Sequence, residues 1–517
     1  MNRTAADSAA GCTDRPATGA SRTAMPRNRS FRFLSDAGSR GARFVPPLHP
    51  PRRRAPRDDP RRRRRAVGDS AVRSRLRRAG CVMMPPGERH DRTAHRRASP
   101  RRRASSMIEV RPFRALRYNF DRYPDISALI APPYDVLDLS DKEALLRRSD
   151  RNVVAVDLPH VPPKSAGPPE AYRRAAETLR SWRSDGTLVC EPSPAMYAYH
   201  QEFMHEGRRY TRKMLIVTLR LSPFSEGNVL PHEETFGGPK EDRLALMKAT
   251  ACQLSPIFGL YSDPEGEVDA ALRPVTRSRP SVVGTLDGVD NRMWTTTDAG
   301  VHRAVSALLS QKKVFIADGH HRYGTALLYR DGLSGDAGRP GGEHPASFIM
   351  FVLASMDDPG CLILPYNRVL PGRALADVLS AWRSSTATCG DAEADLRLFD
   401  PQTQRTVALK FTQRSRLDAL SPEKSPAWRK LDVAYLHRVL IDEDLRAGAA
   451  DLPKVAYVKS VEQARDTARA ERGVALLLNA TPMSHLKAVS EAGDLMPQKS
   501  TFFAPKLVTG MTMYSLE

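Results

Sequence analysis

The first 106 residues are interrupted so often by runs of arginine that no stretch among them can form a hydrophobic core. The runs are PPRRRAP, PRRRRRAVG and SPRRRASS, and the segment holds 28 Arg against 8 Asp and Glu. It contains no Ile, Lys, Tyr, Trp or Gln. Such a chain cannot bury enough apolar surface to offset the conformational entropy that ordering removes. We therefore predict a disordered, Arg-rich tail over 1–106 and a folded domain over 107–517.

Three explanations of the tail stay open. If translation starts at Met107, the tail is upstream GC-rich sequence read as protein, and the absence of five residue types favours this explanation. A genuine arginine-rich arm would grip the phosphate backbone of a nucleic acid electrostatically. An organelle transit peptide would also be rich in arginine and poor in acidic residues.

The net charge of +21 belongs to the tail, because the chain from Met107 onward carries 52 basic and 51 acidic residues. A nearly neutral domain makes nucleic acid an unexpected partner for it. Its apolar runs are much shorter than the roughly 20 residues that cross a bilayer. The six cysteines form no C-x-x-C pair, which suits a reducing compartment. We expect a cytoplasmic protein without membrane segments, long enough to form two lobes.

Strand and helix signals alternate along this domain. Two β-rich runs, 195–205 and 209–221, flank Glu206-Gly207 and predict a β-hairpin. Helical spacing appears over 170–184 and 240–250, and 152–158 reads as a strand. Because a hairpin does not belong to a purely parallel sheet, we predict an α+β fold with a mixed sheet.

The stretch VFIADGHHRYGTALLYR (314–330) has the pattern of a strand that turns into a helix. The start of a helix exposes backbone N–H groups at the positive end of the helix dipole, where a phosphate fits. Gly319 lets a ligand approach the backbone closely, and Arg322 supplies a planar set of donors for phosphate oxygens. Asp318 can cap the helix, hold Mg²⁺ or orient a histidine. We predict a ligand site at this turn.

Two further clusters carry the residue types of a site. The first is PHEET followed by Lys240, in which Glu233 is a candidate general base and His232 is a metal-ligand type. The second is MPQKST with Lys499, whose Lys-Ser-Thr run lacks the glycine-rich context of a phosphate loop. By itself each cluster also fits an ordinary charged helix face or a polar turn.

The motifs RPFRALRYN, APPYDVL, PHEETFGGPKEDRL, FIADGHHRYGTAL and MPQKSTFFAPKLVTG together resemble the domain-of-unknown-function family 1015. The resemblance begins at Met107 and runs to the end of the chain. In LILPYNRVL, Asn367 stands where the family pattern suggests a histidine, which puts any function of that position in doubt. The family by itself implies no reaction.

The strand–Asp-Gly-His-His-Arg–helix unit is also similar to the nucleotide-binding turn of the ParB/sulfiredoxin superfamily, which implies a ParB/sulfiredoxin-like core. That superfamily includes CTP-hydrolysing partition proteins, ATP-using sulfiredoxins and free-serine kinases. The resemblance implies phosphate contacts from His321 and Arg322. Sulfiredoxins carry a reactive cysteine where this chain has His320, so sulfinic-acid repair is not expected.

These resemblances lead to one main hypothesis about function. The chain binds ATP or another nucleotide with Mg²⁺ and acts as a phosphotransferase or NTP hydrolase on a small hydroxyl metabolite, as a free-serine kinase does. Asp318 holds Mg²⁺ or orients His320, and Glu233 is the base. The Gly319 backbone, His321 and Arg322 bind phosphates, and Lys240 and Lys499 add positive charge.

Two alternatives come from other functional classes. One is a ParB-like, nucleotide-gated DNA-binding protein. The other is a metal-dependent hydrolase that uses His232, Glu233, Asp318 and His320.

Overall fold

The computed structural model describes residues 107–163, 165–233, 237–335, 342–446 and 453–517. All of them belong to one compact unit. The tail predicted over 1–106 lies outside the described residues. In the described part of the chain, no helix is long and apolar enough to cross a membrane.

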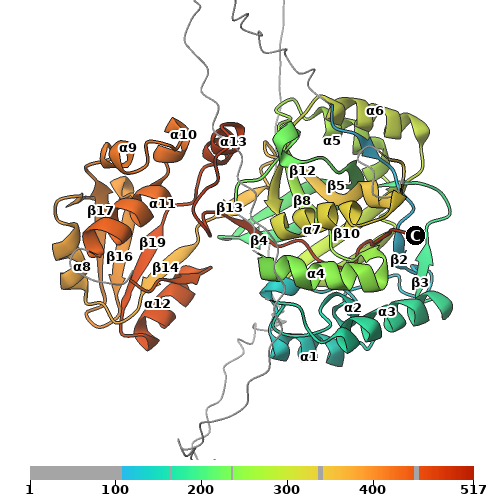
Figure 1. Cartoon of the computed structure of the whole chain (residues 1–517), viewed down its shortest axis with the longest axis horizontal. Coiled ribbons are helices and arrows are strands. Elements are labelled where there is room, and N and C mark those ends of the chain that lie inside the picture. Colours follow the sequence, from blue (N-terminus) through green and yellow to red (C-terminus); the bar gives the residue numbers. More distant parts are fainter. Residues whose placement is uncertain (1–106, 164, 234–236, 336–341, 447–452) are drawn as a thin grey trace, which may run out of the picture. The chain divides into compact units, whose positions relative to one another are not determined.

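A mixed sheet of nine strands is the largest of the five sheets in the described part of the chain (Figure 1). The order is β6-β11-β8-β12-β5-β4-β10-β9, and β1 also pairs with β5. The strands are β1 (Val110–Arg111), β4 (Met196–His205), β5 (Arg208–Arg220), β6 (Val229–Leu230), β8 (Ile257–Tyr261), β9 (Val282–Leu286), β10 (Val289–Thr296), β11 (Val314–Asp318) and β12 (Phe348–Ser355). Strand β11 is parallel to β6 and antiparallel to β8, which confirms the predicted α+β fold with a mixed sheet.

Helices cover both faces of this sheet. Along β12, Ile349, Phe351 and Leu353 belong to one apolar cluster, and Met350, Val352 and Ala354 to the other. This alternation arises because successive strand side chains point to opposite faces. The first cluster includes residues of α5 (Glu267–Thr276), α6 (Ala299–Ser310) and α7 (His320–Asp331), and the second includes residues of α3 (Pro169–Ser184) and α4 (Gly237–Thr250). A strand buried on both faces reads as a continuous apolar run, as FIMFVLA does.

An antiparallel sheet of six described strands has the order β15-β17-β16-β19-β14-β18. The strands are β14 (Asn367–Leu370), β15 (Thr386–Thr388), β16 (Leu396–Asp400), β17 (Arg405–Phe411), β18 (Ala456–Val458) and β19 (Val474–Leu478). The helices of this part of the chain are α8 (Leu375–Trp382), α9 (Arg416–Leu420), α10 (Pro426–Arg429), α11 (Asp432–Tyr435), α12 (Val461–Ala470), α13 (Met483–Glu491) and a π-helix over Leu436–Leu445.

Three two-stranded pairings complete the described strands: β2 (Leu116–Tyr118) with β3 (Leu188–Cys190), β7 (Cys252–Gln253) with β21 (Tyr514–Ser515), and β13 (Leu362–Leu364) with β20 (Phe502–Ala504). The β13–β20 pair holds the MPQKSTFF motif close to the connection between the two larger sheets.

The hairpin over β4 and β5 is confirmed, with Glu206 and Gly207 both at positive φ as a two-residue hairpin turn requires. The strand predicted over 152–158 is wrong, because Val154–Asp157 forms the short helix α2. The Asn152 side chain accepts a hydrogen bond from the Val154 N–H at 3.0 Å and donates to the carbonyls of Ala128 and Ile130. Those bonds favour a turn over a strand. Helix α1 (Leu139–Arg148) lies just before α2 in the chain.

Candidate functional site

The predicted turn joins β11 to α7 and contains Gly319 at φ +95°. A Cβ atom at this position would lie 3.0 Å from Nε of Arg322, because the arginine side chain folds back against the turn. The backbone conformation therefore favours glycine strongly, and a larger residue would also displace the Arg322 side chain. Figure 1 shows α7 beside α4, and Thr325 of α7 donates a hydrogen bond to the Lys240 carbonyl at 3.5 Å.

Asp318 ends β11 and forms two ion pairs. Its Oδ2 accepts from Nζ of Lys506 at 2.7 Å, and its Oδ1 lies 3.5 Å from Nη2 of Arg322. Burial alone would raise the pKa of the Asp318 carboxyl, but Lys506 and Arg322 outweigh it and hold that pKa far below its ordinary value. The same pair raises the pKa of the Lys506 ammonium against the effect of burial. Asp318 is therefore ionised, and its negative charge is balanced by Lys506 and Arg322.

His232 and His320 lie against each other, with ring centroids 4.7 Å apart. Strands β6 and β11 are parallel, so the residues that follow them reach the same edge of the sheet. The His232 backbone N–H donates to Nε2 of His320 at 3.2 Å. Nδ1 of His232 donates to the Ile316 carbonyl at 2.7 Å, which leaves Nε2 to accept from the Thr501 hydroxyl at 3.0 Å. Burial lowers the pKa of both histidines, so both are neutral.

The third sequence cluster joins the other two at this edge. The Met496 N–H donates to the His232 carbonyl at 2.8 Å, and the Lys499 N–H donates to Oε1 of Glu233 at 3.2 Å. With the Lys506–Asp318 pair, these contacts bring residues from around 232, 318 and 500 together. The hypothesis of one site built from all three clusters requires these segments to meet, and they are in contact in the structure.

Positive charge gathers around the turn. The Lys240 side chain packs against Gly324 of α7, where a Cβ atom would lie 3.1 Å from Cε of the lysine. His321 lies one helical turn before Gly324, and burial followed by Lys240 lowers the pKa of His321 while Asp135 and Glu233 oppose that shift. Nζ of Lys499 lies 5.4 Å from the Tyr366 ring centroid. Lys240 and Lys499 both act electrostatically on His321, and neither lysine holds an ion pair with another described residue.

Some neighbours of the site carry no motif in the sequence. Lys459 and Lys506 lie 5.8 and 5.2 Å from the centroid of the Phe502 ring, on opposite sides of the motif in the chain. Burial and the two lysines Lys506 and Lys499 lower the pKa of Lys459. Lys506 lies within the MPQKSTFFAPKLVTG motif, so the sequence could have indicated it as a site residue. Lys459 follows the short strand β18, and no motif around it indicates a site.

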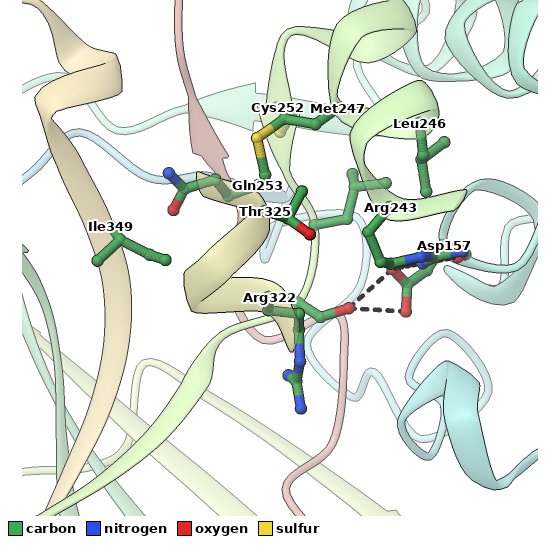
Figure 2. A pocket seen from close by; sticks show the side chains of 11 residues that line it. Asp157, Arg243, Leu246, Met247, Cys252, Gln253, Arg322, Thr325 and Ile349 are labelled. Carbon is green, nitrogen blue, oxygen red and sulfur yellow. Dashed lines mark hydrogen bonds and ion pairs between the residues drawn. The ribbon is translucent and has the colours of Figure 1, made fainter. Parts of the chain in front are cut away.

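Arg322 does not project into this cationic region. Its guanidinium donates to the Pro256 carbonyl and approaches Asp318, and the side chain is mostly buried. Figure 2 shows Arg322 in the lining of a cavity that is also lined by Asp157, Arg243 and Thr325. The cavity measures about 40 Å³, which is room for a few water molecules and too small for a nucleotide. The predicted role of Arg322 in binding phosphate stays a prediction that these contacts disfavour.

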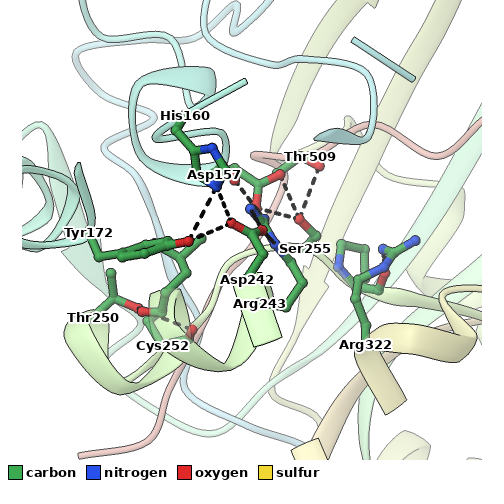
Figure 3. A network of polar contacts seen from close by, with 12 residues as sticks. Asp157, His160, Tyr172, Asp242, Arg243, Thr250, Cys252, Ser255, Arg322 and Thr509 are labelled. Atoms are coloured by element: carbon green, nitrogen blue, oxygen red, sulfur yellow. Dashed lines mark hydrogen bonds and ion pairs between the residues drawn. The ribbon is translucent and has the colours of Figure 1, made fainter. Parts of the chain in front are cut away.

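A buried polar network shares Asp157 and Arg243 with the lining of this cavity (Figure 3). Oδ1 of Asp242 accepts from the Tyr172 hydroxyl at 2.8 Å and lies 2.6 Å from Nε2 of His160. Arg243 donates to Oδ2 of Asp242 and to the Asp157 carbonyl, both at 2.7 Å. Burial raises the pKa of Asp157 in spite of the nearby arginine. The network pairs its own charges, so we assign it a structural role.

A larger pocket of about 380 Å³ lies elsewhere, beside β1 and β21. Its arginines are already engaged: Arg111 with Glu109 and Glu343, and Arg114 with the Glu191 carbonyl. None of the residues predicted for the site lines it.

The residues proposed as metal ligands do not form a metal site. Among the described residues, no three His, Cys, Asp or Glu side chains are grouped so that they could hold a metal ion. Both ring nitrogens of His232 already have hydrogen-bond partners, and Asp318 is bound to two cations. The magnesium role of Asp318 stays a prediction that these ion pairs disfavour.

Asn367, which departs from the family pattern, is buried in β14. Its Oδ1 accepts a hydrogen bond from the Leu478 N–H at 3.2 Å. The asparagine therefore serves the pairing of the six-stranded sheet.

Residues 110–434 match the family described as protein of unknown function DUF1015, which is more than half of the chain. The chain belongs to the DUF1015 family. The DUF1015 match contains the His232 and Asp318 clusters but ends before Met496, so the third cluster lies outside it. The resemblance read from the sequence motifs extended further, to the end of the chain.

No curated protein matches the chain. Solved structures similar to this DUF1015 chain include a free serine kinase mutant in complex with ADP, at 12% identity, covering 57% of this chain and 92% of that chain, with a TM-score of 0.28. Another is SbnI with a C-terminal truncation from Staphylococcus aureus, at 11% identity, 57% and 85% coverage and a TM-score of 0.30. A conserved hypothetical protein from Pyrococcus furiosus gives 12% identity, 57% and 95% coverage and a TM-score of 0.27.

Proposed function

We propose that this DUF1015 protein binds a nucleotide through its phosphates at the β11–α7 turn and transfers the terminal phosphoryl group to a small metabolite that carries a hydroxyl. The observation behind the proposal is the meeting of three segments at one sheet edge, with Lys240 and Lys499 beside His321 and a carboxylate, Glu233, within the same cluster. The sequence resemblance of the Gly319-His320-His321-Arg322 turn to the ParB/sulfiredoxin superfamily supports the same assignment.

Phosphoryl transfer needs positioning and positive charge around three oxygens more than it needs covalent participation by the protein. Lys240, Lys499 and the ring of His321 would bind the phosphates, together with the N–H groups at the start of α7. In the transfer, the bond from the terminal phosphorus to its bridging oxygen breaks, and a new bond forms to the acceptor hydroxyl oxygen. Glu233 would accept the hydroxyl proton. The products are the nucleoside diphosphate and the phosphorylated metabolite.

The other predicted residues have supporting roles in this proposal. Arg322 and Lys506 hold Asp318 and so fix the conformation of the turn around Gly319. His320 accepts the His232 N–H and so joins β6 to the start of α7. We assign no residue to Mg²⁺, which would arrive with the nucleotide phosphates.

Thermal unfolding of the protein with ATP, ADP, CTP and GTP, each with and without Mg²⁺, tests the binding step. A nucleotide at a hundred times its Kd stabilises a fold by about 2.7 kcal/mol, which raises the unfolding midpoint measurably. We expect one nucleotide to give this rise, and Lys240→Met to reduce it. Lys313→Met is the matched control, because Lys313 is an exposed lysine at the other end of β11.

Formation of the nucleoside diphosphate in the presence of serine and other small hydroxyl compounds then tests the transfer step. Glu233→Gln should bind the nucleotide and form little diphosphate. A folded protein whose midpoint responds to no nucleotide would exclude the proposed function.

A further inference from the structure

Lys499 has an unusual backbone conformation for a lysine, with φ at +56°. Side chains with a Cβ atom are disfavoured in this left-handed region, so the surrounding contacts must hold Lys499 there. The residue lies between Gln498 and Ser500, at the bend of the MPQKST motif. A glycine would fit the bend with less strain, but it would not supply an ammonium group.

The guanidinium of Arg368 in β14 donates hydrogen bonds to the backbone carbonyls of this bend. Its Nη2 donates to the Gln498 carbonyl at 3.3 Å and to the Lys499 carbonyl at 2.9 Å. Nη1 donates to the Tyr366 carbonyl, and Nε donates to Nε2 of His437 at 3.3 Å. The side chain is almost fully buried, and no carboxylate is among these partners. The guanidinium thus adds a positive charge directly beneath the bend.

Two consecutive carbonyls that point toward one guanidinium fix the direction of the next two N–H groups. In a trans peptide the N–H lies opposite the carbonyl, and both peptide bonds here are trans. The N–H groups of Lys499 and Ser500 therefore point away from Arg368, toward the side on which Glu233 lies. Successive N–H groups that face one side around a left-handed residue form a concave anion-binding site, called a nest.

A carboxylate already lies in this nest. Oε1 of Glu233 accepts the Lys499 N–H at 3.2 Å. A carboxylate oxygen and a phosphate oxygen are both anionic acceptors, and both are bound by backbone N–H groups of this kind.

We propose that the Lys499 and Ser500 amides are a phosphate-binding site in which the Glu233 carboxylate stands in for a phosphate oxygen, and that a bound phosphate displaces it. The inference rests on the proposed function and adds a regulatory step to it. While Glu233 is bound to the nest, it is not positioned to accept a proton from a substrate. Displacement by the phosphate donor frees the carboxylate to act as base, so the base becomes available only when the donor is present.

Calorimetric titration of the full chain with inorganic pyrophosphate and with ADP tests the competition. If Glu233 fills the nest about nine-tenths of the time, removing its charge should tighten binding about tenfold. Glu233→Gln keeps the size of the side chain but makes it a weaker acceptor. Asp135→Asn is the matched control, because Asp135 is an exposed carboxylate that acts on His321 and Lys506 only through space. It measures the general gain from removing one negative charge.

We expect Glu233→Gln to tighten binding of both probes by several times more than Asp135→Asn does. Equal effects in the two variants, or weaker binding in Glu233→Gln, would overturn the displacement while leaving the proposed function intact. If no form of the protein binds pyrophosphate and the unfolding midpoint of the folded protein responds to none of the four nucleotides, both proposals are overturned.

A second measurement, by NMR, observes the backbone amide of Lys499 directly. Labelling with [¹⁵N]lysine gives at most 15 backbone signals, and Lys499→Arg identifies the signal of Lys499 by its loss. The chemical shift of the Lys499 amide should change in Glu233→Gln without ligand. With bound pyrophosphate, the wild type and the variant should have the same chemical shift for this amide. A Lys499 signal that ignores bound pyrophosphate would contradict the nest assignment.

Discussion

At the scale of single residues, Asp318 carries the clearest consequence of the site's charge arrangement. Its folded pKa is depressed because two cations outweigh the effect of burial. A carboxyl with a depressed folded pKa contributes stability that is fully present above its unfolded pKa of about 3.9 and is lost as the pH falls toward the folded value. Asp318 should therefore stabilise the protein throughout the neutral range.

Replacing Lys506 by methionine removes the stronger of these two partners. We expect Lys506→Met to lower the free energy of unfolding at pH 7 by about 3 kcal/mol, since it leaves a mostly buried carboxylate incompletely paired. Burial then raises the pKa of Asp318, so protonation relieves the variant, and the difference from wild type should shrink as the pH falls from 7 to 4. Urea denaturation at pH 7, 5 and 4 measures this.

Lys213→Met is the control for that series. Lys213 pairs with Asp269 at 2.9 Å, but the lysine side chain is exposed to solvent and the aspartate side chain is only half-buried. Such a pair contributes about 1 kcal/mol or less. If Lys506→Met behaved like this control at every pH, the assigned coupling of Lys506 to Asp318 would be wrong.

At the scale of elements, the sequence predicts structure well where the pattern is long. The β4–β5 hairpin and helices α3 and α4 follow from alternation, helical spacing and turn residues. The short segment 152–158 does not, because one side chain, Asn152, decides its conformation through bonds to Ala128 and Ile130. A run of apolar residues alone cannot distinguish a buried strand from a buried helical turn.

Strand β14 offers a test of how one element holds the MPQKST bend. Arg368→Met removes a buried charge, a change that can itself be neutral or favourable. It also leaves the carbonyls of Tyr366, Gln498 and Lys499 without their donor, at about 1–3 kcal/mol for each buried group. The second effect should win, so we expect a net loss of about 2 kcal/mol or more in the free energy of unfolding, with a smaller nucleotide-induced rise in the midpoint.

Arg405→Met in β17 is the matched control, since Arg405 is an exposed strand arginine. A surface change of this kind should stay within about 0.5 kcal/mol of wild type in urea denaturation. A nucleotide response in Arg368→Met equal to that of wild type would show that the bend is held by other contacts.

At the scale of the whole molecule, the Arg-rich segment and the folded unit should be separable. A protein made of residues 107–517 should unfold at the same midpoint as the full chain and respond to the same nucleotide, because the predicted core and site lie within those residues. Thermal scans of both proteins check this. A midpoint several degrees lower in the shorter protein would show that residues before Met107 contribute to the fold.

Binding of duplex DNA by the same two proteins tests the alternative of a ParB-like DNA-binding protein. The arginine runs should give the full chain salt-dependent DNA binding that 107–517 lacks. Binding by 107–517 alone would favour the DNA-binding alternative over phosphoryl transfer.

The sequence by itself determined the strand–turn–helix at 314–330, the α+β class and the resemblance to the DUF1015 family. These follow from local periodicity and from motifs read within a few residues of each other. Only the tertiary structure decided which charges pair. Lys506 lies 188 residues from Asp318 in the chain, Arg322 turns inward to Pro256, and Arg368 holds a bend 131 residues away. The physical reason is that an ion pair or a buried donor depends on distances in space, which local sequence patterns do not encode.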